Sequence, residues 1–181
     1  MKPGMATSDH DHLQKLLQAF PTAMLVTRSP TGVLRSRPMM VIRRQNDPSL
    51  WFAARFDSAQ VAELVQDPQV NVAFHRKDAS VSVSGKAALV HDRLIVRELW
   101  QDTWRLWFPD GPEEMELVLV QVTPSTAEYW DLSGAKGLRF IVNGALALLR
   151  GDEPKPVEGA HAVVDEARVV AADQTATATH N

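Results

Sequence analysis

The pattern that most constrains the fold is the spacing of apolar residues between Thr22 and Asp131. These residues recur in short runs with a period of about two, and turn-forming residues separate the runs. A period of two predicts strands with one buried face, and hairpin-length spacing predicts antiparallel pairing. Because helices do not separate successive strands regularly, a doubly wound parallel sheet is disfavoured. We therefore expect a mainly β protein, an antiparallel barrel with flanking helices.

The predicted strands cover residues 22–27, 33–44, 50–54, 70–74, 80–90 with a bulge or corner at Gly85, 117–122 and 127–131. A first helix is predicted from Ser8, which can cap it, to Phe20, since Pro21 ends it. Further helices are predicted after Asp57-Ser58, after Asp92 and over 137–150.

The 181 residues fit one domain, predicted over residues 9–150 after a flexible N-terminus of residues 1–8. Residues 151–181 contain no Leu, Ile, Met, Phe, Trp or Tyr. Such a segment buries too little apolar surface to offset its ordering entropy, so a mostly disordered tail is expected. The valine pairs at 163–164 and 169–170 leave open that a short part docks on the body.

Composition excludes several classes of function. The chain has no cysteine, so disulfides and thiolate chemistry are excluded. A net charge of −3 argues against nucleic-acid binding, and no apolar run approaches the roughly 20 residues of a membrane span. The polar first residues lack a signal sequence, so we expect a cytoplasmic protein without a membrane partner. The histidines are not spaced as metal ligands, so no metal site is expected.

Arg35 and Arg37 lie two positions apart in a predicted strand and therefore point to the same face. Two guanidinium groups on one face repel unless an anion lies between them, and a phosphate or carboxylate ligand would suit. Pro38 marks an edge or irregularity of the strand where a ligand could reach the backbone. The alternative is two exposed arginines that protect an edge strand from aggregation.

Two further features have both a structural and a ligand-binding interpretation. Asp57-Ser58 is typical of an ordinary helix N-cap, but the amides at a helix start also hold phosphate, and Arg55 lies nearby. Trp107-Phe108 precedes Pro-Asp-Gly, a turn that would make both rings project. The chain's five tryptophans could flank a flat heteroaromatic ligand, or fill a core or an interface.

A series of motifs occurs in order along the chain: 23–27 (AMLVT), 34–39 (LRSRPM), 50–52 (LWF), 81–85 (VSVSG), 98–100 (ELW), 107–111 (WFPDG) and 127–131 (AEYWD). The series resembles the FMN-binding split-barrel family related to pyridoxamine 5′-phosphate oxidase, specifically its bacterial general stress protein branch. The resemblance extends from about Leu13 to Asp131. It implies a split β-barrel of the FMN-binding type with peripheral helices, and a homodimer with a flavin site at the subunit interface.

The same resemblance implies roles for individual residues. Arg37 would reach the flavin, and Arg35, Ser36, Pro38 and Met39 would line the same strand. Trp51, Phe52 and Ala53 would form walls along the isoalloxazine, and Ser58 and Gln60 would hold the phosphate. Trp107, Phe108 and Trp130 would come from the partner subunit.

The chain departs from the family pattern at three places. Ala54 stands where the family commonly has threonine, and Gln60 replaces a lysine of the phosphate site; Arg55 could supply the missing charge. Residues 132–140 contain only Arg139 where the oxidase proper has an arginine–histidine pair for pyridoxal phosphate. Oxidation of pyridoxamine phosphate is therefore not expected.

The expected function is an FMN-dependent oxidoreductase acting on an unidentified small molecule, with NAD(P)H as a possible electron donor. The alternatives are a non-enzymatic flavin-binding stress protein and a cofactor-free dimeric scaffold. The split barrel also hosts deazaflavin and haem, so the fold alone does not select FMN.

Overall fold

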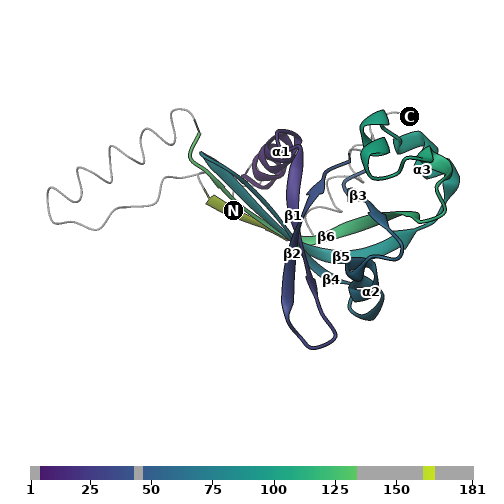
Figure 1. Ribbon diagram of the computed structural model, residues 1–181. Helices are drawn as coiled ribbons and strands as arrows, with labels where there is room; N and C mark the ends of the chain where they lie inside the picture. Colours follow the sequence, from purple (N-terminus) through teal and green to yellow (C-terminus); the bar gives the residue numbers. More distant parts are fainter. Residues whose placement is uncertain (1–4, 43–46, 134–160, 166–181) are drawn as a thin grey trace, which may run out of the picture. The chain divides into compact units, whose positions relative to one another are not determined.

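The computed structural model describes residues 5–42, 47–133 and 161–165, and over these ranges the chain is mostly antiparallel β-sheet with three α-helices (Figure 1). The helices are α1 (Met5–Gln18), α2 (Ala59–Gln66) and α3 (Arg93–Leu99), and two 3₁₀ helices are η1 (Asp102–Leu106) and η2 (Gly111–Glu113). The strands are β1 (Thr22–Arg28), β2 (Leu34–Met40), β3 (Leu50–Arg55), β4 (Gln69–Arg76), β5 (Ala79–Val90), β6 (Leu117–Asp131) and β7 (His161–Asp165).

The sheet has the strand order β2-β1-β4-β5-β6-β3, with β7 pairing with β6. Adjacent strands β1 and β2 form a hairpin in which Leu25 lies opposite Arg37. The sheet does not close, because β2 and β3 are its two ends. An isolated antiparallel bridge links Ile42, which follows β2, to Trp51 of β3. The mainly β class predicted from the period-two pattern is confirmed.

The chain divides into two compact units, and β4, β5 and β6 contribute residues to both. Unit 2 comprises residues 21–72 and 84–125, and it contains β1 to β3, α2 and α3. Its helices begin at the predicted caps, since the side chains of Ser58 and Asp92 accept hydrogen bonds from Val61 N and Leu94 N. One core of this unit consists of Ile42, Trp51, Val96, Leu99, Trp104, Phe108, Leu117 and Leu119.

Unit 1 comprises residues 1–20, 73–83 and 126–181, of which the described ranges form α1, β7 and parts of the long strands. The predicted apolar face of α1 is buried, namely Leu13, Leu16, Leu17 and Phe20. The ring of Phe20 packs against Phe74 with centroids 5.4 Å apart. His12 Nε2 lies 2.7 Å from the buried carboxylate of Asp131.

Several boundary predictions need correction. Helix α1 begins at Met5, so residues 5–8 are helical rather than flexible. Strand β2 is shorter than predicted, and β6 is one strand where two were expected. Residues 161–165 of the tail expected to be mostly disordered form β7, with Val164 buried opposite Ala127, so the alternative that a valine pair docks holds for residues 163–164. The helix predicted over 137–150 lies outside the described residues.

None of the helices in the described ranges is long and apolar enough to cross a membrane.

Candidate functional site

Unit 2 contains a cavity of about 660 Å³, a volume typical of small-molecule sites. Its wall is built from β2, β3, the start of α2 and the segment around η1. Most of the wall is apolar, with a few polar groups. The lining residues are Thr22, Arg37, Pro38, Met39, Met40, Ile42, Ala53, Ala54, Arg55, Ser58, Ala59, Gln60, Trp104, Trp107 and Phe108.

Residues from three predicted motifs meet at this cavity: Arg37, Pro38 and Met39; Ala53, Arg55, Ser58 and Gln60; and Trp107 and Phe108. The other predicted residues do not line it. Arg35 and Ser36 lie on β2 outside the lining, and Trp130 belongs to unit 1. Trp51 and Phe52 are completely buried, and Trp51 Nε1 donates a hydrogen bond to Asp47 at 2.8 Å.

The aromatic pair before the Pro-Asp-Gly turn has two different environments. Gly111 closes the turn with φ = +81°, and its amide donates to the Phe108 carbonyl. Trp107 is half exposed, so the prediction of a projecting ring holds for it. The prediction is wrong for Phe108, which is buried against Trp104 in the unit 2 core. Both residues line the cavity of their own chain, and the family resemblance implied that they would also reach a partner's site.

Sequence reasoning missed other lining residues, namely Thr22, Met40, Ile42 and Ala59. Met40 carried a usable signal, since it continues the strand of Arg37. Trp104 also lines the cavity, and the sequence had included it only among the five tryptophans that could flank a ligand or fill a core. Ala54 was singled out only as a departure from the family pattern, yet it forms part of the wall.

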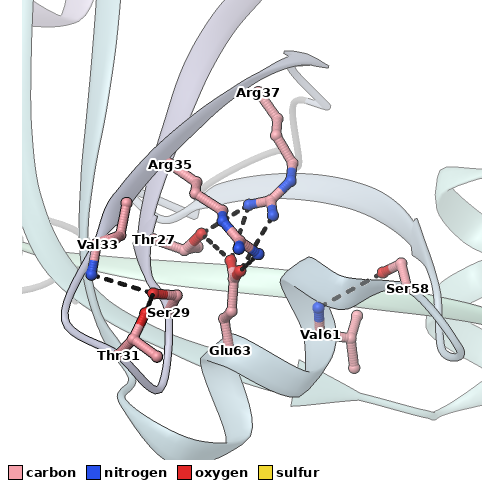
Figure 2. Close-up of polar contacts among 9 residues, drawn as sticks. All are labelled: Thr27, Ser29, Thr31, Val33, Arg35, Arg37, Ser58, Val61 and Glu63. Atoms are coloured by element: carbon pink, nitrogen blue, oxygen red, sulfur yellow. Dashed lines mark hydrogen bonds and ion pairs between the residues drawn. The ribbon is translucent and has the colours of Figure 1, made fainter.

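Glu63 is the anion that lies between the two arginines of β2 (Figure 2). Arg37 donates from Nη1 to Glu63 Oε2 at 2.9 Å and from Nη2 to Oε1 at 3.2 Å. Arg35 donates from Nη1 to Oε1 at 2.8 Å. Thr27, on the neighbouring strand, donates its hydroxyl proton to Oε2 at 2.6 Å and accepts from Arg37 at 2.8 Å. The arginines therefore share a face as predicted, but a carboxylate of the protein fills the space between them.

The surroundings of Glu63 fix its charge. Hydrogen bonds from Arg37 are the main cause that lowers the pKa of Glu63, burial opposes them, and together with Thr27 and Arg35 they bring this pKa to about 2. Since its side chain is only 3% exposed, the carboxylate is an ionised group held away from water. It fixes Arg37 at the wall of the cavity.

Arg55 is held in a comparable way on β3. Its Nε donates to Asp57 Oδ1 at 3.1 Å, and its Nη1 donates to Glu114 Oε1 at 3.2 Å. Glu114 is buried and also accepts the amide of Asp110. The hydrogen bond to Asp57 is the main cause that raises the pKa of Arg55 above its usual value. The second cation of the cavity wall is thus also bound to carboxylates.

Ser58 and Gln60 lie at the start of α2. The Ser58 hydroxyl accepts a hydrogen bond from Val61 N at 3.4 Å, so the ordinary capping role predicted for it is present. Ser58 also lines the cavity, as does the buried Gln60. The two predicted interpretations of this helix start are therefore compatible.

The fold and the cavity define an antiparallel β protein with a small-molecule site between two strands and a helix start. Residues 8–155 match the family model described as "Pyridoxamine 5'-phosphate oxidase like", and the chain belongs to this family. The resemblance to this family noted in the sequence is confirmed.

The chain is similar to three known proteins. Protein bli-3 of Neurospora crassa is 31% identical over 119 residues, which cover 59% of this chain and 57% of that protein, so the chain spans little more than half of that relative. The general stress FMN/FAD binding protein of Xanthomonas citri is 26% identical with a TM-score of 0.62, over 71% of this chain and 92% of that one. General Stress Protein 26 of Bacillus anthracis shares the fold at 23% identity and a TM-score of 0.60, over 66% and 91% of the two chains.

Proposed function

We propose that the chain binds FMN in the cavity of unit 2 and acts as an oxidoreductase that uses the bound flavin. One observation carries the proposal: Arg37, the start of α2 and Trp107 line one cavity of about 660 Å³. Membership of the family and the similarity to an FMN/FAD binding protein support it.

The residues of the wall fit the ring and the phosphate of a flavin nucleotide. Trp107 and the apolar side chains of Pro38 and Ala53 suit the isoalloxazine ring. Ser58 and Arg55 lie where a phosphate would find hydrogen-bond donors. Bound FMN would supply hydride and electron exchange, which no side chain provides. The chain itself would orient the ring, exclude water from it and hold Arg37 in place through Glu63.

The substrate is proposed to differ from pyridoxamine phosphate. Residues 132–140 lack the arginine–histidine pair that the oxidase proper has there for that substrate. An electron donor such as NAD(P)H and an unidentified small-molecule acceptor are the simplest pair for the bound flavin.

We further propose that the active form is a homodimer in which the cavity lies at the interface. Leu106 is 78% exposed and Trp107 is 51% exposed, although both side chains are large and apolar. Trp107 also lines the cavity, so a second subunit covering this surface would enclose the ligand.

Light scattering should give twice the mass of the chain, and Leu106→Glu should shift the protein toward the monomer. A monomeric wild-type protein at micromolar concentration would contradict this arrangement.

FMN titration monitored by tryptophan fluorescence tests the proposed function. Saturable quenching at micromolar FMN is expected, because Trp104 and Trp107 line the cavity. Ala59→Phe should abolish the quenching by filling the cavity. Ala62→Phe is the matched control, since Ala62 lies on the same helix, is exposed and does not line the cavity. Absence of saturable quenching in the wild type would refute FMN binding.

Reduction of the bound flavin tests the enzymatic part. Anaerobic addition of NAD(P)H should bleach the flavin absorbance at a rate useful for catalysis if the protein is an oxidoreductase. A flavin that binds but is not reduced would indicate a non-enzymatic flavin-binding protein instead.

A further inference from the structure

The cations at the cavity wall are paired with carboxylates of the protein itself. Arg37 and Arg55 are the two cationic residues among those that line the cavity. Each of them contacts at least one carboxylate that is almost completely buried, Glu63 or Glu114. Neither carboxylate is among the lining residues. A ligand in the cavity therefore meets guanidinium groups that already have carboxylate partners.

At the Arg37 end, Glu63 accepts hydrogen bonds from both Nη atoms of Arg37, with distances of 2.9 and 3.2 Å. This is the two-pronged arrangement by which arginine usually binds a phosphate or carboxylate ligand. Arg35 adds a second cation whose Nη1 donates to the same carboxylate, so Arg35, Arg37 and Glu63 together keep one net positive charge. Both Nη atoms of Arg37 are nevertheless already engaged by Glu63.

Around Arg55, at the other end of the cavity wall, carboxylates outnumber cations. Asp57 lies 3.1 Å from Arg55 Nε, and Glu114 lies 3.2 Å from its Nη1. The charge of Glu116 also acts on Arg55 and contributes to raising its pKa. The nearby guanidinium of Arg93 donates to the backbone oxygens of Glu114, Met115 and Leu117. A phosphate beside Arg55 would therefore meet negative charge within a few ångströms of its cationic partner.

From the pairing of these cations we infer that the cavity selects a flavin by its ring system and not by its phosphate, so that riboflavin and FMN bind with similar affinity. The inference rests on the proposed flavin site and names the part of the ligand that is recognised. The attraction of a phosphate to Arg55 is offset by repulsion from Asp57, Glu114 and Glu116, and both Nη atoms of Arg37 are already bound to Glu63. The other lining residues are apolar or uncharged, including Met39, Ala53 and Gln60.

Direct comparison of two ligands tests the inference. Full-length protein is titrated with FMN and with riboflavin, and tryptophan quenching gives both dissociation constants. We expect the constants to agree within about tenfold, since one unopposed charge-assisted hydrogen bond would already exceed that ratio. A ratio above about tenfold in favour of FMN would overturn the inference and leave the flavin site intact. Failure of both ligands to bind would instead overturn the proposed function, and the inference with it.

Removal of a balancing carboxylate should create a preference for the phosphate. Asp57→Asn removes one of the two carboxylates that pair with Arg55, so FMN should bind about threefold more tightly at low ionic strength while riboflavin affinity stays constant. Glu113→Gln is the matched control, because Glu113 is about as exposed, pairs with Arg97 and does not line the cavity. Glu63→Gln tests the other end of the cavity in the same way. If neither Asp57→Asn nor Glu63→Gln raises the ratio above that of Glu113→Gln, the charge balance does not set the selectivity.

Discussion

At the scale of single residues, Glu63 connects three side chains of the hairpin β1–β2 to helix α2: Thr27, Arg35 and Arg37. Glu63→Gln keeps the shape but removes the charge that both arginines require. Because the carboxylate is buried and the arginines are partly exposed, we expect a loss of about 1–3 kcal/mol in the free energy of unfolding at pH 7. Urea denaturation measures this difference.

The control for this prediction is Glu113→Gln, which breaks the pair between Glu113 and Arg97. Both of those side chains are more than half exposed, so the pair should contribute little to stability. Equal denaturation midpoints for Glu63→Gln and the wild type would show that the Glu63 contacts do not stabilise the fold.

A second prediction concerns the single residue Gln60. Gln60→Lys places a cation on the cavity wall, at the position where the family pattern has a lysine of the phosphate site. FMN should then bind about tenfold more tightly, since a charge-assisted hydrogen bond replaces a neutral one. Riboflavin, which has no phosphate, should bind as before. Unchanged FMN affinity in the titration would place the phosphate away from Gln60.

The sequence predicted the common face of Arg35 and Arg37 because strand alternation is a local property. It could not predict Glu63, since that contact joins residues 26 and 28 positions apart through the packing of α2 on β1 and β2. The burial of Phe108 could not be predicted from the local sequence either. The turn after it was correctly predicted, but whether its ring is buried depends on Trp104 and Val96, which tertiary structure brings together.

At the scale of elements, Gly85 allows β5 to lie close to β6. A side chain at Gly85 would meet the backbone oxygen of Thr123 and would lie 3.2 Å from Pro124 Cα. Backbone atoms cannot move aside as a flexible side chain can, so Gly85→Ala should destabilise the protein by about 2–4 kcal/mol. Thermal unfolding measures the loss.

Gly32 provides the comparison for Gly85. It has φ = +83°, but a methyl group at that position would have open space around it, with no contact within 4 Å. Gly32→Ala should therefore cost only the conformational strain of about 1 kcal/mol. An equal loss at both positions would show that close approach is not what requires glycine at Gly85.

Strand β6 shows why the sequence divided one element into two. The run Thr123-Pro124-Ser125-Thr126 has the composition of a turn. In the structure β6 pairs with β3 up to Val122 and with β7 from Thr126. Pro124 lies between these two paired stretches, where its missing amide breaks neither ladder. Such a position is recognised only once the partner strands are known, and β7 comes from a segment whose composition predicted disorder.

At the scale of the whole molecule, the arrangement of charges makes stability depend on pH in the acidic range. Hydrogen bonds, first from Arg37 and then from Thr27 and Arg35, lower the pKa of Glu63 from 4.5 to about 2 despite burial, and the pKa values of Asp57 and Glu113 are lowered mainly by their arginine partners. Burial raises the pKa of Asp131, but hydrogen bonds from Ser133 and contact with His12 outweigh it, so this pKa is lowered as well. All four carboxylates therefore bind protons less readily in the folded chain than in the unfolded chain.

A group whose pKa is lowered by folding stabilises the protein above its unfolded pKa and ceases to do so as the pH falls through its folded pKa. The free energy of unfolding should thus be nearly constant from pH 7 to about pH 5 and should fall as the pH drops from about 4.5 to about 2. Glu63→Gln should be less stable than the wild type on the plateau but should lose less on acidification, so that the two curves converge near pH 2. Urea denaturation at a series of pH values tests this convergence. Parallel curves would show that Glu63 is not the group whose protonation unfolds the protein, and would weaken the case that its charge holds Arg37 at the cavity.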